Sequence, residues 1–590
     1  MRRFLLASLM GMLISTLAFG VDIKSQIGTQ DLNMDADGAA HGTFQRRTST
    51  GGTITLDKID GNQIPWSNAY TRTIRPADLI TKGPWVDVRA YLPAGYVTDG
   101  SVDYSTQVQQ ALDNITANGT LVIPLTVGVG AASWVGLTIA SKSYVSIVGM
   151  GGGGFKLLAQ PTQSALAGTY HPILKVSSSS HINIVNLVIN RNGIESMGIA
   201  FVDVSDSSIR NNYIYGAPST GSVNNLNVGS GGYCYRNTYS GNLIEGGSHG
   251  FLLGYNLTNY ETGSVITNNR IRNLDGDAIV YVGGHGIIDG NYMDNVNVGA
   301  LAGCLTGADN TNDIGRFITI SNNTINDTIW FGIQMDSVSN AILKHITISG
   351  NVLSRTGYDG IYAPFTSYLS IYGNTIYGYG WDNTQNSHGI TAGLGGRDVV
   401  IANNTIDGVY TTGAAQAGIY IIIGSQGSDN NYIVDGNTIS KGYRGIYYAS
   451  EEGYVSSHHK ITNNIITGVG LDGVIISSDD FTDIYFSGNT IKDSARYGLY
   501  NAHPVSRQLY GANNVYENNT SGNILGGGPI MIYGNNTAHA FLSAAPTDNT
   551  VTWNANDITW KLGTDNVIGW KCTVAGAPGT WKSMTITLEP

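Results

Sequence analysis

Charged residues are scarce in this chain. They make up 12% of its 590 residues, and acidic residues outnumber basic ones to give a formal net charge of −11. No basic patch or stripe stands out, although such a feature is the electrostatic footprint of a nucleic-acid-binding protein. Nucleic acid is therefore not a predicted partner. An acidic glycan stays open as a ligand, because the local field at a cleft governs its binding more than the net charge does.

Cysteine is rare as well. Cys234, Cys304 and Cys572 lie far apart in the chain. Their spacing matches neither a disulfide framework nor a set of metal ligands. Cys304 falls at an apolar position of the repeat described below, so we expect it to be a buried free thiol.

Long apolar runs are missing beyond the start of the chain. Residues 4–19 follow a basic start, and Ser8, Gly11 and Ser15 interrupt them. A spanning helix needs about 20 consecutive apolar residues, whereas a charged start, a short apolar run and a small-residue end are typical of a secretory signal. We expect residues 1–20 to be a signal peptide, the protein to be secreted to the extracellular space or cell surface, and no segment to span a membrane.

Glycine is abundant, at 78 residues, and much of it belongs to a repeated phrase. Each copy carries an Asn before an apolar residue, then a turn, then Gly followed by an apolar residue. The asparagines recur about every 27 residues, which is the size of one solenoid coil. They are Asn186, Asn212, Asn242, Asn269, Asn291, Asn323, Asn351, Asn374, Asn404, Asn437, Asn464, Asn489 and Asn514. Asparagine tolerates the left-handed conformation of a bend, and its amide can bond to its counterpart in the next coil, so we expect a structural role.

The glycine positions predict which residues face the core. They are Gly250, Ala278, Gly303, Gly332, Gly360, Gly389, Gly418, Gly445, Gly473 and Gly498. The next residue is apolar almost throughout and includes Cys304, so it is predicted to point inward. By alternation along a strand, the residue two after the glycine points outward. The residue just before the glycine forms a second column that varies from coil to coil and is therefore a candidate position for functional groups.

The two ends of the repeat differ from it. Residues 21–83 form an extended N-terminal segment without clear periodicity. Val108, Ala111 and Leu112 have helical spacing after Ser105, a predicted N-cap, and such a helix would cover the exposed end of the core. The predicted β-helix with this cap spans 84–528. Residues 529–590 are predicted to be a small Trp-rich β module, whose tryptophans form its core or bind sugar or another subunit, making it a candidate site of homo-oligomer assembly.

The capping region resembles the N-terminal cap of the pectate lyase superfamily. The matching stretches are Asp87-Val88-Arg89-Ala90-Tyr91, Asp99-Gly100-Ser101-Val102-Asp103-Tyr104-Ser105 and Gly119-Thr120-Leu121-Val122-Ile123-Pro124. The resemblance implies an all-β protein with a right-handed single-stranded parallel β-helix. It implies no particular reaction.

Candidate catalytic residues stand mainly in the position before the glycine. Asp359 and His388 are one coil apart, and Arg444, Asp472 and Tyr497 fall on three successive coils, with His503 just beyond. A lyase or epimerase acting on a uronic acid needs a cation, a base and a proton donor, and these residue types can supply them. Asp-Gly and His-Gly are also ordinary turn dipeptides, which is the structural alternative.

Two further motif resemblances broaden the choice of reaction. Residues 387–395 with Asp359 resemble motifs of polygalacturonase-type hydrolases, although Phe331 and Tyr420 stand where that family has an acidic and a basic residue. Hydrolysis usually needs two carboxylates about 5–9.5 Å apart, whereas Asp359 and Asp472 are four coils, or roughly 19 Å, apart. Residues 497–503 resemble a motif of alginate C5-epimerases.

Binding residues are predicted beside these positions. The outward tyrosines Tyr362, Tyr420, Tyr447 and Tyr500 are candidates for stacking on sugar rings, or reflect ordinary β-propensity. Asp479 and Asp480 form either a Ca²⁺ site or a solvated bend. The leading prediction is a polysaccharide lyase acting by β-elimination on a uronic-acid-containing glycan. The alternatives are a glycoside hydrolase, a C5-epimerase, and a non-catalytic glycan-binding adhesin or tailspike-like shaft.

Overall fold

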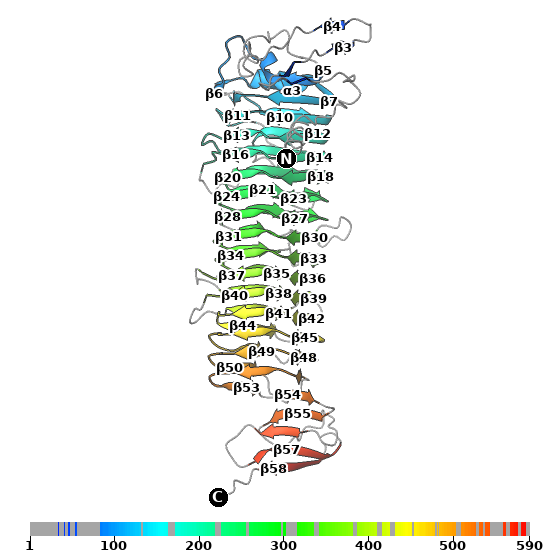
Figure 1. The fold of residues 1–590 in the computed structure, drawn as a ribbon, viewed down its shortest axis with the longest axis vertical. Coiled ribbons are helices and arrows are strands. Elements are labelled where there is room, and N and C mark those ends of the chain that lie inside the picture. The colour runs from blue at the N-terminus through cyan, green and yellow to red at the C-terminus, as the bar shows by residue number, and fades with distance from the viewer. Residues whose placement is uncertain are drawn as a thin grey trace. The chain divides into compact units, whose positions relative to one another are not determined.

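A computed structural model gives the structure of the chain (Figure 1). It describes residues 33–34, 40–41, 45–47, 53–55, 83–130, 134–162, 171–218, 226–254, 259–296, 299–302, 315–335, 342–381, 386–409, 416–424, 431–450, 454–477, 481, 483–502, 509–526, 530–534, 537–542, 558–561, 567–575 and 580–585. The chain divides into two units, Met1–Leu79 and Ile80–Pro590. In the first, β1 (Asn33–Met34) pairs with β2 (Ala40–His41) and β3 (Gln45–Arg47) with β4 (Thr53–Thr55), both antiparallel.

The second unit is a parallel β-solenoid of about 13 turns. Figure 1 shows its strands stacked coil on coil. One sheet has 16 strands: β6 (Asp99–Asp103), β8 (Thr126–Val129), β11 (Gly154–Leu157), β13 (Val188–Asn190), β16 (Tyr213–Tyr215), β20 (Leu243–Glu245), β24 (Arg270–Leu274), β28 (Tyr292–Val296), β31 (Thr324–Thr328), β34 (Val352–Thr356), β37 (Thr375–Tyr377), β40 (Thr405–Asp407), β43 (Thr438–Ser440), β46 (Ile465–Thr467), β49 (Thr490–Lys492) and β52 (Val515–Glu517).

Two further columns of strands complete each coil. The column that carries the Gly-apolar phrase comprises β9 (Leu137–Ala140), β12 (Pro172–Val185), β14 (Met197–Ser205), β17 (Leu226–Gly231), β21 (His249–Leu253), β25 (Ile279–Tyr281), β29 (Gly299–Ala302), β32 (Phe331–Gln334), β35 (Ile361–Pro364), β38 (His388–Gly393), β41 (Ala417–Ile423), β44 (Arg444–Ser450), β47 (Val474–Ile476), β50 (Tyr497–Asn501) and β53 (Gly522–Gly526).

The third column joins the second through the long β12. It comprises β5 (Gly83–Asp87), β7 (Ile115–Ile123), β10 (Ser143–Gly149), β12, β15 (Ser208–Arg210), β19 (Thr238–Ser240), β23 (Val265–Thr267), β27 (Ile287–Asp289), β30 (Arg316–Ser321), β33 (Leu343–Ser349), β36 (Thr366–Tyr372), β39 (Val399–Ala402), β42 (Tyr432–Asp435), β45 (His459–Thr462), β48 (Ile484–Ser487), β51 (Leu509–Ala512) and β54 (Ile530–Gly534). Shorter strands beside it are β18 (Tyr233–Tyr235), β22 (Tyr260–Thr262) and β26 (Gly283–Gly284).

The core is a set of apolar ladders that run from coil to coil. Ile361, Ile390, Ile419 and Ile446 pair in register and are fully buried. The glycine before each is required by space: a Cβ on Gly389 would lie 2.5 Å from the carbonyl oxygen of Gly418. The predicted inward position is thereby confirmed for these coils.

The asparagine ladder is confirmed as well. Asn404 illustrates it: its Nδ2 donates to Asn437 Oδ1 at 2.9 Å and to the Ile371 carbonyl at 3.0 Å, while its Oδ1 accepts the backbone N–H of Asn374 at 3.0 Å. The left-handed conformation, however, belongs to the residue before the ladder, such as Asn403 with φ 55°. The ladder asparagines form hydrogen bonds through their side-chain amides, whereas the residue before each ladder asparagine forms the bend.

Two assignments from the sequence are wrong in register. Asn186 is a left-handed bend residue with φ 57°, and the ladder position of its coil is Leu187, whose N–H donates to Asn212. In the coil of β29, Leu301 pairs with Ile279 and Ile333, so the glycine position is Ala300 and not Gly303. Cys304, expected to be a buried free thiol, lies outside the described residues.

The N-terminal cap contains α3 (Ser105–Asn114), preceded by the 3₁₀ turn η3 (Val88–Ala90). Val108, Ala111 and Leu112 are fully buried, as their spacing predicts. Ser105 is the first residue of the helix rather than its N-cap, which is Tyr104. The Asp103 carboxylate accepts the Ser105 N–H at 2.9 Å and satisfies this donor instead.

Strand pairing changes character after β54. There β55 (Thr537–Leu542), β56 (Ile558–Lys561), β57 (Val567–Val574) and β58 (Thr580–Thr585) follow, with antiparallel pairs β54–β55, β56–β57 and β57–β58. Cys572 is a buried free thiol in β57, and Cys234 is a buried free thiol in the solenoid core. No helix in the described part of the chain is long and apolar enough to cross a membrane.

Candidate functional site

The predicted site residues that the structure describes lie in β32, β35, β38, β41, β44, β47 and β50 and in the turns that lead into these strands. Column A holds the residues before the glycines: Phe331, Asp359, His388, Ala417, Arg444, Asp472 and Tyr497. Column B holds the residues two after them: Gln334, Tyr362, Thr391, Tyr420, Tyr447, Ile475 and Tyr500, and its members pair in register from coil to coil. Neighbours within a column are therefore one coil apart, roughly 4.8 Å.

Asp359 lies against the coil of His388, as predicted, but its carboxylate is already engaged. It accepts the backbone N–H of His388 and the hydroxyl of Thr391, each at 2.6 Å. Only 3% of the residue is exposed. Burial raises the pKa of the carboxyl to about 7, although the two hydrogen bonds act in the opposite direction. Loss of solvation disfavours the charged form of a carboxyl.

His388 is held in one tautomer. Its Nδ1 accepts the backbone N–H of Ala417 at 3.0 Å, so in the neutral ring the proton is on Nε2. The ring is 5% exposed and stacks on Tyr420 with centroids 4.3 Å apart. Burial, together with the charge of Arg444, lowers the pKa of the imidazole to about 3. Neutral His388 is therefore a hydrogen-bond donor through Nε2 rather than a base.

These two groups make opposite contributions to the pH dependence of stability. Asp359 has a pKa raised from 3.8 to about 7, so its contribution is present at low pH and is lost as pH rises between these values. His388 has a pKa lowered from 6.5 to about 3, so its contribution is present above pH 6.5 and is lost as pH falls. Between pH 3.8 and about 7, we expect the thermal unfolding midpoint of Asp359→Asn, taken relative to that of wild type, to rise with pH. Between pH of about 3 and 6.5, we expect the midpoint of His388→Gln, taken relative to that of wild type, to fall as the pH rises. Parallel profiles for the two variants would contradict these assignments.

Arg444 is the cation of the face. Its guanidinium carbon lies 5.0 Å from the ring centre of Tyr443 and 4.9 Å from that of Tyr447. Nε and Nη1 are buried and have no hydrogen-bond partner among the described residues. A buried donor without an acceptor costs about 1–3 kcal/mol, and more when it is charged. Arg444 thus has hydrogen-bonding capacity that the described residues do not use.

Asp472 does not serve as the counter-ion of Arg444, although it is one coil away. It is fully buried, and its Oδ1 accepts from Arg496 Nε at 2.8 Å and from the Tyr497 N–H at 3.1 Å. Oδ2 accepts from Arg496 Nη2. The sequence did not single out Arg496, because it stands in the turn before Tyr497, outside columns A and B. Its guanidinium also covers Tyr500, at 4.6 Å from the ring centre.

The predicted outward tyrosines belong to three separate aromatic groups. Tyr420 stacks on Tyr447 with centroids 5.2 Å apart, and Ile475 separates this pair from Tyr500. Tyr497 and Tyr500 stack at 6.0 Å. Farther toward the N-terminus, Tyr362 stacks on Phe331 at 4.9 Å. All four predicted tyrosines are half-buried, so each offers only part of its ring to a ligand.

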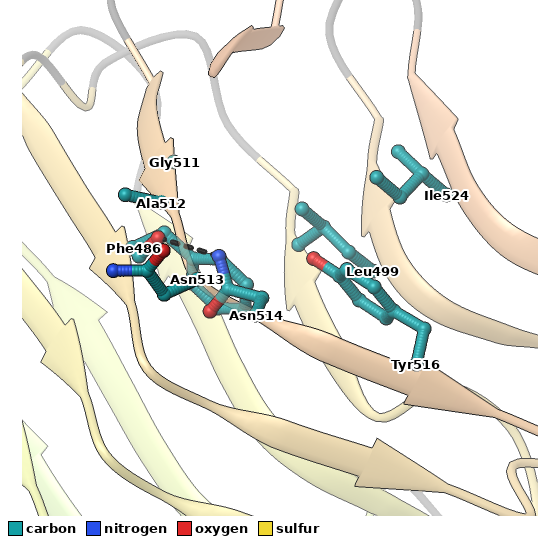
Figure 2. Close-up of a pocket in the computed structure, with 8 residues that line it drawn as sticks. All are labelled: Phe486, Leu499, Gly511, Ala512, Asn513, Asn514, Tyr516 and Ile524. Carbon is teal, nitrogen blue, oxygen red and sulfur yellow. Dashed lines mark hydrogen bonds between the residues drawn. The ribbon is translucent and has the colours of Figure 1, made fainter. Parts of the chain in front are cut away.

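Three predicted site residues, His503, Asp479 and Asp480, lie outside the described residues. Within the described part of the chain, no group of three His, Cys, Asp or Glu residues could hold a metal ion. A cavity of about 100 Å³ lies in the last coils, and Figure 2 shows the residues that line it. The inward-facing Leu499 and the rings of Phe486 and Tyr516 line it, so it is an incompletely filled part of the core and not part of columns A and B.

A comparison with protein families bears on the fold. Residues 304–491 match a family model described as "Right handed beta helix region". The fold expected from the sequence, a right-handed parallel β-helix, is therefore confirmed.

The solved structures that are similar to this chain share little sequence with it. No curated protein matches the sequence. Among solved structures, the chain is similar to the A-module of mannuronan C-5 epimerase AlgE6 from Azotobacter vinelandii, with 15% identity over 74% of this chain and 99% of that one and a TM-score of 0.37. It is also similar to tailspike protein 3 of bacteriophage CBA120 (13% identity, 98% and 76% coverage, TM-score 0.44). A third is the catalytic unit of the GH87 α-1,3-glucanase from Streptomyces thermodiastaticus strain HF3-3, with 14% identity over 70% of this chain and 70% of that one and a TM-score of 0.43. At these identities the likeness concerns the fold alone.

Proposed function

We propose that this protein binds an acidic polysaccharide along columns A and B and cleaves it by β-elimination. The observation that carries the proposal is Arg444, whose buried Nε and Nη1 lack acceptors among the described residues while aromatic rings lie against the guanidinium. A uronate carboxylate supplies oxygen acceptors in the geometry that a guanidinium binds best. The neighbouring rings of Tyr420 and Tyr447 offer apolar surface for a sugar ring.

The charges of the face favour an acidic ligand. In the described residues of columns A and B, the only carboxylates are Asp359 and Asp472, and both are buried and hydrogen-bonded. Neither presents a free negative charge toward a bound polyanion, in spite of the net charge of −11. The same fact weakens the alternative of hydrolysis, which usually needs two available carboxylates about 5–9.5 Å apart.

Each step of β-elimination has a candidate group. Arg444 neutralises the uronate carboxylate and so makes the C5 proton easier to remove. In its phenolate form Tyr447 takes this proton, and the C4–O bond breaks as the C4=C5 double bond forms. The Tyr447 hydroxyl formed in this way then passes the proton to the leaving oxygen, which restores the phenolate. His388 contributes a fixed Nε2–H donor at the edge of the site, since its Nδ1 is occupied by the Ala417 N–H.

Binding without cleavage is the second candidate function. It is favoured by the same hydrogen bonds, because neither His388 nor the two carboxylates is available as a base. Residues 1–20 support the further proposal that the protein is exported to meet an extracellular glycan.

A panel of polymers distinguishes these functions. Purified protein is incubated with polygalacturonate, alginate and neutral glycans, each with and without Ca²⁺. We expect an increase in ultraviolet absorbance from the unsaturated product with a polyuronate only. New reducing ends without this absorbance would indicate hydrolysis, and binding without either product would indicate the second candidate. Equal behaviour toward acidic and neutral polymers would contradict the proposal.

A further inference from the structure

An exposed group of aromatic rings lies at the N-terminal end of the candidate site. We define the distal platform as Trp330, Tyr358 and Trp381. Trp330 stacks on Tyr358 with centroids 5.6 Å apart and planes 15° from parallel. Trp330 is 44% exposed and Trp381 is 41% exposed, and the two residues stand in corresponding turns two coils apart, after β31 and β37. Contiguous exposed aromatic surface of this kind marks a binding site more often than it serves the fold.

The distal platform is joined to column B by ring contacts. Tyr358 meets the edge of Phe331 at 5.3 Å between centroids, and Phe331 in turn stacks on Tyr362 at 4.9 Å. Aromatic surface therefore continues from the platform onto the outer face that carries Arg444. A ligand that extends from Arg444 along this face toward the N-terminal end of the solenoid therefore reaches the distal platform.

The platform is held in place before any ligand arrives. Trp381 Nε1 donates to the Thr328 carbonyl at 3.2 Å, and the Arg355 guanidinium lies 5.5 Å from the Trp381 ring. Arg355 is itself paired with Asp327 at 3.1 Å. Rings fixed in this way lose little conformational freedom on binding, which favours affinity.

We propose that the distal platform is a sugar-binding subsite for the same acidic polysaccharide whose carboxylate is bound at Arg444, so the inference rests on the proposed function. Phe331 and Arg444 stand four coil steps apart in column A, roughly 19 Å along the axis. A sugar residue in an extended polymer advances by about one coil spacing, roughly 5 Å. One chain therefore reaches both sites only if it has about five residues or more. Such a ligand stacks the apolar face of one sugar on the rings and places a carboxylate at the guanidinium.

The dependence of affinity on ligand length tests this subsite. Uronate oligosaccharides of about three and about seven residues, which fall below and above the span of four coils, are titrated calorimetrically into wild type and Trp330→Ala. We expect the variant to lose about 10-fold in affinity for the long oligosaccharide, a value typical of one lost ring stack, and to keep wild-type affinity for the short one. Trp381→Phe, which keeps a ring but loses the Nε1–H bond, should show a smaller loss with the same length dependence.

A matched control exists on another column of strands. Tyr485 is 49% exposed and stacks on Tyr510 at 5.0 Å, so Tyr485→Ala removes a comparable exposed ring away from the site. It should leave both affinities unchanged. Wild-type affinity of Trp330→Ala for the long oligosaccharide would overturn the subsite alone, as would a change of oligomeric state in that variant without a change in affinity. Failure of wild type to bind either oligosaccharide would overturn the proposed function as well.

Discussion

Arg444→Ala is expected to bind polyuronate on the order of 100-fold more weakly than wild type, which corresponds to about 2.7 kcal/mol. The loss follows because a bound carboxylate would make charge-assisted hydrogen bonds to Nε and Nη1, each worth roughly 1.5–3 kcal/mol. The thermal unfolding midpoint should change little or rise, since the substitution removes buried donors that lack acceptors among the described residues. Titration of polygalacturonate into both proteins, with the unfolding midpoint measured in parallel, checks this expectation.

Arg270→Ala is the matched control for Arg444→Ala. Arg270 is exposed on the 16-stranded sheet and lies 5.4 Å from the ring centre of Tyr292, so its removal also deletes one Arg–Tyr contact. Its polyuronate affinity should equal that of wild type at constant ionic strength. Equal losses in both variants would show that the effect of Arg444 comes from net charge and not from a site.

Asn404→Ala is expected to have the largest effect on stability, about 3–5 kcal/mol. The side chain accepts the backbone N–H and the Nδ2 of Asn374, and it donates to the Ile371 carbonyl and to Asn437. Alanine leaves several of these buried groups without partners, and water does not reach them. Thermal and urea unfolding of the purified variant measure the loss.

Asn403→Gly tests whether the ladder, and not the bend, carries this stability. Asn403 has φ 55°, and the equivalent residue in the coils on either side is glycine, at Gly373 and Gly436. Glycine adopts this conformation without steric cost, so the substitution should change stability by less than about 1 kcal/mol. A loss as large as that of Asn404→Ala would contradict the separate roles of the two positions.

The scaffold was largely predictable from the sequence because its requirements repeat. Buried amides and Cβ-free positions recur in every coil, so Asn and Gly recur with them. The register failed where the sequence offers two equivalent phrases three residues apart: Ala300-Leu301 and Gly303-Cys304 both read as a small residue before an apolar one. Only strand pairing decides between them, and it selects Leu301.

The site was less predictable because its chemistry depends on contacts between coils. The pattern placed Asp359, His388, Arg444 and Asp472 in one column of the repeat. It gave no sign that Asp359, His388 and Asp472 are buried. The pattern also did not indicate that the Ala417 N–H fixes the tautomer of His388, or that Arg496 forms an ion pair with the carboxylate of Asp472. Trp330 and Trp381 stand in turns beside the columns, so the periodic pattern gave them no weight.

The most direct test of the Arg444 site is a crystal structure of the protein with a uronate oligosaccharide of about seven residues, long enough to span four coils. We expect a carboxylate within hydrogen-bond distance of the Arg444 guanidinium and sugar rings along columns A and B. Density for the oligosaccharide on another face, or along columns A and B with every carboxylate directed away from Arg444, would contradict the central claim.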